Sequence, residues 1–290
     1  MLPPLEWPYA ALGFLLGALV GSFLNVCIVR WPDGGSVVRP PSRCPRCERP
    51  IRWHENVPIV GWLALRGRCR GCALPISPLY PAIELTTALV WLGSVVAFGV
   101  GFEALRVAVF ATVLLGIATT DARRYLIPDG FTVFLLLWTL ATAVVAQGPA
   151  AAARFAGPYE ALVGACTGAG IVAIIGWLGE LAFKKEAMGF GDVTMMAGVG
   201  AALGPERALL TVVVGAFVGA VASITVLVPV AWVLHRRRGA TVGAGSEGEE
   251  SGGFELPLVP FGVFLAPAAL LTLLFGDRMI AWYFATILPS

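Results

Sequence analysis

The most visible pattern in the chain is a series of long apolar stretches separated by short polar segments. Eight stretches contain no charged residue: 7–29, 85–102, 107–120, 130–153, 161–179, 193–205, 208–234 and 256–276. A helix needs about 20 residues to cross the hydrocarbon core of a bilayer, and most of these stretches approach or exceed that length. No strand-like alternation of the kind found in membrane barrels is present. The pattern therefore predicts an all-α polytopic membrane protein with about eight transmembrane helices.

Charge is sparse in the chain and unevenly distributed along it. Charged residues make up 13% of the 290 residues, and the formal net charge is only +2. If the N-terminus is outside, sixteen of the 20 Lys and Arg residues fall in cytoplasmic loops. Those left outside are Arg106, Arg154, Arg207 and Arg278. The positive-inside rule favours this orientation, and the basic loops are expected to contact anionic lipid headgroups rather than nucleic acid.

The polar segments divide the chain into three parts. Residues 1–30 are predicted to form a retained first transmembrane helix, because the stretch is too long for a signal peptide and lacks its basic start. Residues 31–80 form a cytoplasmic insert rich in Arg, Pro and Cys. Residues 81–290 hold the other helices, with a cytoplasmic loop at 235–255 that is rich in Gly, Ser and Glu. We find no internal repeat.

The insert contains two CxxC pairs, Cys44/Cys47 and Cys69/Cys72, separated by 21 residues. This arrangement is typical of tetrahedral zinc sites, in which each pair supplies two thiolates from a tight turn. A segment of about 50 residues with few apolar side chains cannot build a stable core alone, and a bound metal would supply the missing folding free energy. The sequence predicts a structural zinc site, although iron accepts the same ligands.

Disulfides and a redox-active CxxC are the alternatives for these cysteines. The cytoplasm is reducing, and a redox role would require only one pair within a βαβ unit, which is not visible here. Cys27 and Cys166 lie in apolar helices and are expected to be ordinary buried residues. His54 and His235 are expected to be solvated loop residues.

Two aspartates are predicted to lie at the cytoplasmic ends of transmembrane helices. Asp121 ends the third span, and Asp192 begins the sixth, directly after Gly189 and Gly191. The apolar part of the sixth span covers only about 20 Å of a roughly 30 Å hydrocarbon core. Asp192 should therefore lie inside the cytoplasmic leaflet, and the two glycines should permit an unwound backbone beside it.

Acidic residues within the membrane are candidates for a functional site. If the carboxyl groups of Asp121 and Asp192 face each other, they would share one proton and could activate a water molecule as in aspartic proteases. The alternative is that both are interfacial residues, with Asp192 favoured by the helix dipole. For Glu84 and Glu180, interfacial solvation or ion pairing is expected, and Asp129 is expected to cap the fourth span.

Five motifs in order along the chain resemble the bacterial type IV prepilin leader peptidases, a family of membrane aspartic proteases. They are GSFLNVCIVRWP at 21–32, the four-cysteine stretch at 43–84, DARRYLIPD at 121–129, GFGD at 189–192 and PFGVFLAPAA at 260–269. The resemblance implies that Asp121 and Asp192 are the catalytic pair, with Gly189 and Gly191 as active-site backbone and Asp129 in a supporting motif. One position departs from the family, since Thr194 stands where many members have lysine.

The resemblance also implies the substrates and the location. It points to prepilins or type II secretion pseudopilins, cleaved at the cytoplasmic face of the bacterial inner membrane. Many members also methylate the new N-terminus with S-adenosylmethionine, although no nucleotide-binding motif is visible here. The alternatives are a transporter that uses the two acids to move protons or cations, and a scaffold that docks partners through its zinc insert. The sequence gives no oligomeric state.

Overall fold

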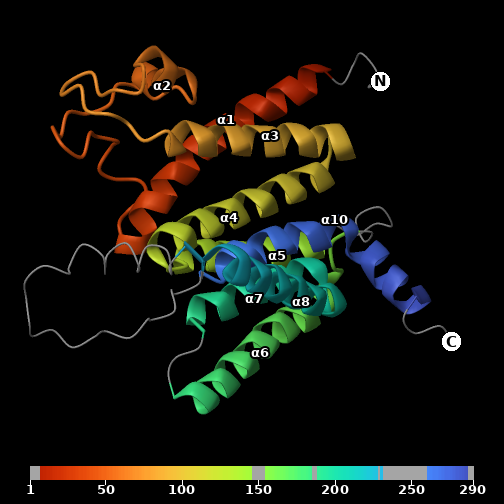
Figure 1. Cartoon of the computed structure of the whole chain (residues 1–290). Helices are drawn as coiled ribbons and strands as arrows, with labels where there is room; N and C mark the ends of the chain where they lie inside the picture. Colours follow the sequence, from red (N-terminus) through yellow and green to blue (C-terminus); the bar gives the residue numbers. More distant parts are fainter. Residues whose placement is uncertain (1–6, 146–153, 185–187, 228, 231–259, 287–290) are drawn as a thin grey trace, which may run out of the picture.

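The computed structural model describes residues 7–145, 154–184, 188–227, 229–230 and 260–286 (Figure 1). The predicted loop 235–255, with His235 in it, lies outside the described residues. Within the described part the chain is helical and contains no strand, only two isolated β-bridges. The prediction of an all-α membrane protein is thus confirmed.

Eight helices in the described part correspond to the eight apolar stretches. They are α1 (Trp7–Arg30), α3 (Leu79–Phe98), α4 (Phe102–Arg124), α5 (Asp129–Val145), α6 (Pro158–Phe183), α7 (Phe190–Leu203), α8 (Pro205–Ala222) and α10 (Gly262–Thr286). Six of them are long and apolar enough to span a membrane, whereas α5 and α7 are shorter. The predicted number of eight spans is therefore approximate.

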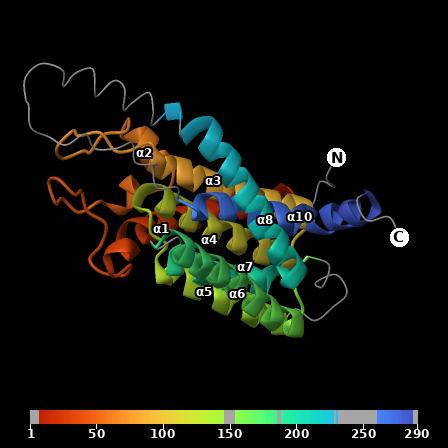
Figure 2. The same ribbon diagram turned by 60° about the horizontal axis from the view of Figure 1, so that its bottom comes forward.

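Helices α1 and α3 lie side by side in both views of the molecule (Figures 1 and 2). Glycines on α1 make this close contact possible. A Cβ added at Gly17 would lie 2.8 Å from Cα of Ala88, and one added at Gly21 would lie 2.8 Å from Cα of Glu84. Small residues let helix backbones approach closely in membranes, where apolar side chains gain little by leaving lipid.

Helices α6 and α7 pack closely in the same way. A Cβ at Gly164 would collide with the carbonyl oxygen of Gly200, and a Cβ at Gly168 would collide with that of Met196. This packing fixes α7, and with it Asp192, against the longer helix α6.

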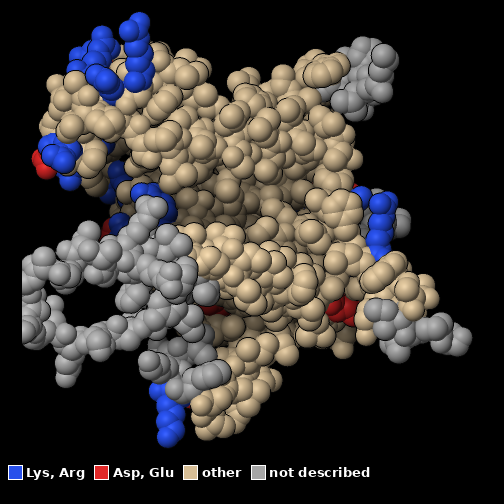
Figure 3. Space-filling model, viewed as in Figure 1, with Lys and Arg blue, Asp and Glu red and all other residues tan. Residues whose placement is uncertain are grey.

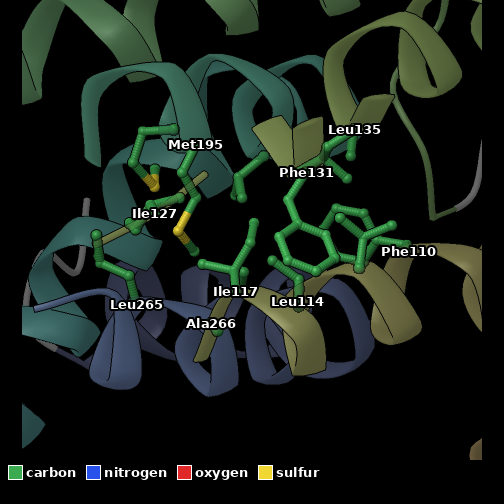
Figure 4. Packing of buried hydrophobic residues seen from close by; sticks show 14 of the residues in the cluster. Phe110, Leu114, Ile117, Ile127, Phe131, Leu135, Met195, Leu265 and Ala266 are labelled. Carbon is green, nitrogen blue, oxygen red and sulfur yellow. The ribbon is translucent and has the colours of Figure 1, made fainter. Parts of the chain in front are cut away.

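The buried core lies around α4, which contacts α1, α3, α5 and α10. Figure 4 shows side chains from four helices meeting there, together with Ile127 from the connection between α4 and α5. Those labelled are Phe110, Leu114, Ile117, Ile127, Phe131, Leu135, Met195, Leu265 and Ala266. Cys27 is buried in this core as expected, but Cys166 is exposed on α6, so the prediction of burial is wrong for Cys166. In an apolar membrane helix, a small residue can face outward as readily as inward.

The insert between α1 and α3 lies at one end of the helix bundle, and arginine side chains are prominent on its surface (Figures 1 and 3). It contains two short 3-10 helices, Trp31–Asp33 and Trp53–Glu55, and the short helix α2 (Val60–Ala64). Its first residues also contact the end of α4 and the beginning of α5. The Trp31 and Phe131 rings pack edge to face, with 4.5 Å between ring centroids. Arg124 forms an ion pair with Asp33 at 2.9 Å.

Candidate metal site and candidate active site

The four cysteines of the insert converge on one point. Their Sγ atoms all lie within 4.8 Å of one another, with 3.9 Å between Cys44 and Cys72 and between Cys47 and Cys69. Four thiolates around zinc, with Zn–S bonds of about 2.3 Å, are separated by about 3.8 Å in a regular tetrahedron. The cluster is therefore of the right size and chemistry to hold one metal ion.

The two CxxC turns have the same backbone structure. In the first, Cys44 N donates to Arg49 O at 3.0 Å; in the second, Cys69 N donates to Leu74 O at 2.8 Å. The β-bridges Arg43–Pro50 and Arg68–Pro75 close the two turns at matching positions. The expectation of no internal repeat is thus wrong for this segment. The pattern RCxxCxxP, which begins at residue 43 and again at residue 68, was the overlooked signal.

Each turn also has one residue in the left-handed backbone conformation, at the same position after its cysteine pair. These residues are Glu48, with φ 54°, and Ala73, with φ 56°. The tight turns direct backbone N–H groups at the sulfur atoms. Hydrogen bonds from the backbone N–H groups of Cys47 and Arg46 lower the pKa of the Cys44 thiol to about 6. The pKa of Cys69 is lowered by the same kind of hydrogen bond, whereas that of Cys72 is raised by burial beside the other thiols. The thiolate is the form that binds a metal.

Glu55 connects the two cysteine turns and was missed in the sequence. Its carboxylate accepts two hydrogen bonds from Arg49 at 2.9 and 3.1 Å and one from Arg70 at 3.3 Å. The Arg49 hydrogen bond is the main reason why the pKa of Glu55 is lowered to about 2. The signal available in the sequence was that Glu55 is one of only two acidic residues, with Glu48, in the arginine-rich segment 43–70.

Both predicted aspartates are buried near one end of the bundle. Asp121 lies in the last turn of α4, and its Oδ2 accepts a hydrogen bond from the backbone N–H of Val263 at 3.1 Å, in the first turn of α10. Asp192 lies in the first turn of α7, and its Oδ1 has no hydrogen-bond partner among the described residues. The two carboxyl groups are close enough to repel each other when both are ionised.

Ile127 occupies the space between the segments that carry this pair. Its Cβ lies 2.8 Å from where a Cβ at Gly191 would be, and its Cδ1 lies 3.0 Å from the equivalent position at Gly262. A Cβ at Gly262 would also lie 2.9 Å from Asp121 Oδ2. Three chain segments thus meet at the aspartates. Ile127, Gly262 and Val263 were not identified as site residues, although they lie within the motifs at 121–129 and 260–269.

The glycines before Asp192 differ in part from the prediction. Gly189 is extended (φ −74°, ψ 149°) and precedes α7, whereas Gly191 is inside the helix. The predicted unwinding is therefore wrong for Gly191, whose lack of a side chain makes room for Ile127. Thr194 donates its hydroxyl to the carbonyl of Gly191 at 3.1 Å within the same helix.

Asp129 lies apart from this constellation. It is the first residue of α5 and its side chain is exposed, without a hydrogen bond to any described residue. Its backbone carbonyl accepts the Thr132 hydroxyl at 3.3 Å. A negative charge here favours the start of α5, and its capping role remains a prediction.

Two family models match the chain. Residues 15–98 match the Bacterial Peptidase A24 N-terminal domain, and residues 108–224 match the Type IV leader peptidase family. No solved structure matches the chain.

Three relatives share the name "Prepilin leader peptidase/N-methyltransferase". The protein from Myxococcus xanthus is 40% identical over 220 residues, which span 76% of this chain and 63% of that protein. The one from Aeromonas hydrophila is 33% identical, over 98% of this chain and 97% of its own. The one from Stutzerimonas stutzeri is 35% identical, over 97% and 94%. The chain therefore belongs to the type IV leader peptidase family.

Proposed function

We propose that this protein is a membrane-embedded aspartic endopeptidase that removes the leader from type IV prepilins, with Asp121 and Asp192 as its catalytic pair. The observation that carries the proposal is the pair itself: two buried carboxyl groups on different helices, at one end of a membrane bundle, in a chain of this family. The family gives no support to the alternative of a transporter.

The two aspartates have unequal surroundings, which suggests unequal roles. Asp121 accepts a backbone N–H at the start of α10, and such a bond favours the ionised form. Asp192 leaves Oδ1 buried and unpartnered, and its carboxyl group has a single backbone hydrogen bond, from Gly189. A buried charged group that is only partly hydrogen-bonded costs at least about 1–3 kcal/mol. Its position in the first turn of α7 offsets only about 0.3–1 kcal/mol of that cost. We therefore assign the shared proton to Asp192.

The proposed reaction follows from this assignment. Asp121 takes a proton from a water molecule, whose oxygen attacks the carbonyl carbon of the scissile bond. Asp192 donates its proton to the carbonyl oxygen, which becomes a hydroxyl in the tetrahedral intermediate. When the intermediate collapses, the C–N bond breaks and the proton held by Asp121 passes to the leaving nitrogen. One hydroxyl of the intermediate returns its proton to Asp192 as the C=O bond re-forms, which restores the starting protonation of the pair.

The orientation and the substrates belong to the same proposal. The Arg-rich insert lies at one end of the bundle (Figure 1). Asp121 lies near that end, because Arg124 in the same helical turn pairs with Asp33 of the insert. The positive-inside rule favours a cytoplasmic location for this end. We propose a multi-pass protein of the bacterial inner membrane, with its N-terminus outside and its insert near lipid headgroups. Prepilins and pseudopilins would keep their apolar helix in the bilayer while the leader junction enters the site.

The four-cysteine cluster fits zinc, which we propose as its metal. Zinc would supply folding free energy to the insert and take no part in hydrolysis. The relatives' shared name also leads us to propose that the protein methylates the new N-terminus of its product, using S-adenosylmethionine. The proposed domains are the first transmembrane helix (1–30), the metal-binding insert (31–80) and the peptidase domain (81–290).

Cleavage of a prepilin-like peptide in liposomes tests the proposal. Asp121→Asn and Asp192→Asn should each abolish cleavage, while Asp129→Asn, which alters an exposed acid at the same end, should retain it. Thermal unfolding of each purified variant controls for folding. Retained cleavage in either catalytic-pair variant removes that aspartate from the mechanism. Absence of cleavage by the wild-type protein, across several leader sequences, contradicts the proposed function itself.

A further inference from the structure

Glu84 is a buried acidic residue that the proposed mechanism does not use. It lies in the second turn of α3, is 9% exposed, and has no ion pair with any described residue. The prediction of an interfacial or ion-paired glutamate is therefore wrong. Its Oε2 instead accepts a short hydrogen bond, 2.7 Å, from the backbone N–H of Ile59 in the insert.

The backbone at Ile59 has an unfavourable conformation. Ile59 has φ 63° and ψ −54°, and Val60 N donates to Pro58 O at 2.6 Å across it. These features define a γ-turn with positive φ, which is rare and strained for any residue. A β-branched residue at positive φ is a true outlier. Such conformations persist only where their surroundings hold them in place, and they mark candidate functional positions.

The surroundings of Glu84 can supply that constraint. The polar side chains of Ser22 and Asn25 on α1 lie close enough to Glu84 to favour its ionised form, so α1 contributes to the same polar cluster. Asn25 Nδ2 additionally donates to Tyr80 O at 3.0 Å, at the beginning of α3. Gly21 lets the two helix backbones approach at the Cα of Glu84. The carboxylate is thus held by two membrane helices when it binds the insert.

The strained turn is also connected to the metal site. Gly61 follows it by two residues and packs so closely on the carbonyl of Glu55 that no Cβ would fit. Glu55 in turn holds Arg49 of the first cysteine turn and Arg70 of the second. Displacement of the turn at Ile59 would therefore be transmitted to both cysteine turns.

We propose that Glu84 is a positioning residue that anchors the metal-binding insert to the membrane helices, by holding the strained γ-turn at Ile59. The other edge of the insert contacts the chain beside the catalytic pair, through Asp33 and Arg124. An anchored insert then keeps a fixed position beside the catalytic pair. The functional consequence rests on the proposed peptidase activity, whereas the anchoring does not.

Amide hydrogen exchange of the purified, metal-loaded protein tests the anchoring directly. Glu84→Leu removes the acceptor and should speed exchange across residues 56–64 by roughly tenfold or more, the range expected for loss of a charge-assisted hydrogen bond. Glu84→Gln keeps an acceptor and should show a smaller change. Ser94→Ala is the matched control, because Ser94 is buried on the same helix but bonds only to Val90 O.

A second variant tests the strain. Ile59→Gly places in the turn the one residue that tolerates positive φ, so it should keep the exchange rate of the wild-type protein. In the double variant Glu84→Leu/Ile59→Gly, protection should recover in part, since the turn no longer needs to be held. A general loss of packing around Glu84 would not be rescued by a glycine in the insert. Additive effects of the two substitutions would overturn the role of strain.

Cleavage kinetics complete the test. Glu84→Leu should raise KM for a prepilin-like peptide while kcat changes little, because the catalytic pair is untouched. Unchanged exchange in Glu84→Leu overturns the anchor, whatever the cleavage rate. Failure of the wild-type protein to cleave contradicts the proposed function but leaves the exchange result standing, so the two failures can be told apart.

Discussion

Gly168 provides a stringent test of how closely α6 and α7 must pack. Alanine is the better helix former by about 1 kcal/mol, so intrinsic propensity alone predicts that Gly168→Ala is harmless or stabilising. In the structure, however, the new Cβ would lie deep inside contact distance of the Met196 carbonyl oxygen. That oxygen belongs to the backbone of a helix and cannot move independently, so α7 must shift as a body.

The size of that shift sets the expected effect. Ordinary contact begins near 3.4 Å, so α7 must move on the order of 1 Å, and a displacement of this size at catalytic groups can reduce the rate about 100-fold. Asp192 lies four residues before Met196, about one helical turn away, and would move with it. We expect Gly168→Ala to lower kcat for peptide cleavage in liposomes by about one to two orders of magnitude.

Gly170→Ala is the matched control for this experiment. Gly170 lies on the same helix, but a Cβ added there meets no atom within 4 Å. This variant should cleave at the wild-type rate and unfold at the same temperature or slightly higher. Wild-type kcat in Gly168→Ala would refute the idea that the glycine contact determines the position of Asp192. Equal losses in both variants would indicate a general effect on α6 instead.

Three further predictions concern the insert. Chelation of the metal, or Cys69→Ser, should unfold residues 43–75 while the membrane helices persist; full amide protection without metal would contradict a structural metal. Because the pKa of Glu55 is lowered from 4.5 to about 2, its ionised form stabilises the insert above pH 4.5, and this contribution is lost as the pH falls from 4.5 toward 2. Thermal unfolding of the insert should therefore depend more steeply on pH over that range than in Glu55→Gln, and parallel curves would contradict the prediction. Asp33→Asn breaks only an exposed ion pair with Arg124, so we expect a loss below about 1 kcal/mol in unfolding experiments, and a larger loss would assign the pair a greater role.

The helices and the cysteine site could be predicted from the sequence because each follows from local composition. Hydrocarbon imposes long uncharged stretches, and all eight predicted stretches correspond to helices. Metal coordination imposes paired cysteines at short spacing, and these four sulfurs converge. In both cases the physical constraint acts on residues that are near one another in the chain.

The details of the aspartate site could not be predicted as fully from the sequence, because they depend on groups that are far apart along the chain. The donor to Asp121 is a backbone N–H, which every residue except proline carries, so nothing in the sequence distinguishes Val263. Glu84 precedes an apolar stretch and therefore looks interfacial. Its burial depends on partners from α1 and from the insert, which only the folded chain brings together.

The hydrogen bond between Asp121 and Val263 also has a consequence for biosynthesis. The two residues are separated by 142 positions, and α10 is the last described helix to leave the ribosome. Until α10 has entered the membrane, Asp121 lacks the N–H group that orients it, although both aspartates have already been synthesised. A nascent chain thus carries both acids of the proposed catalytic pair before the site is complete, and neighbouring membrane proteins meet the complete site only after α10 has been synthesised.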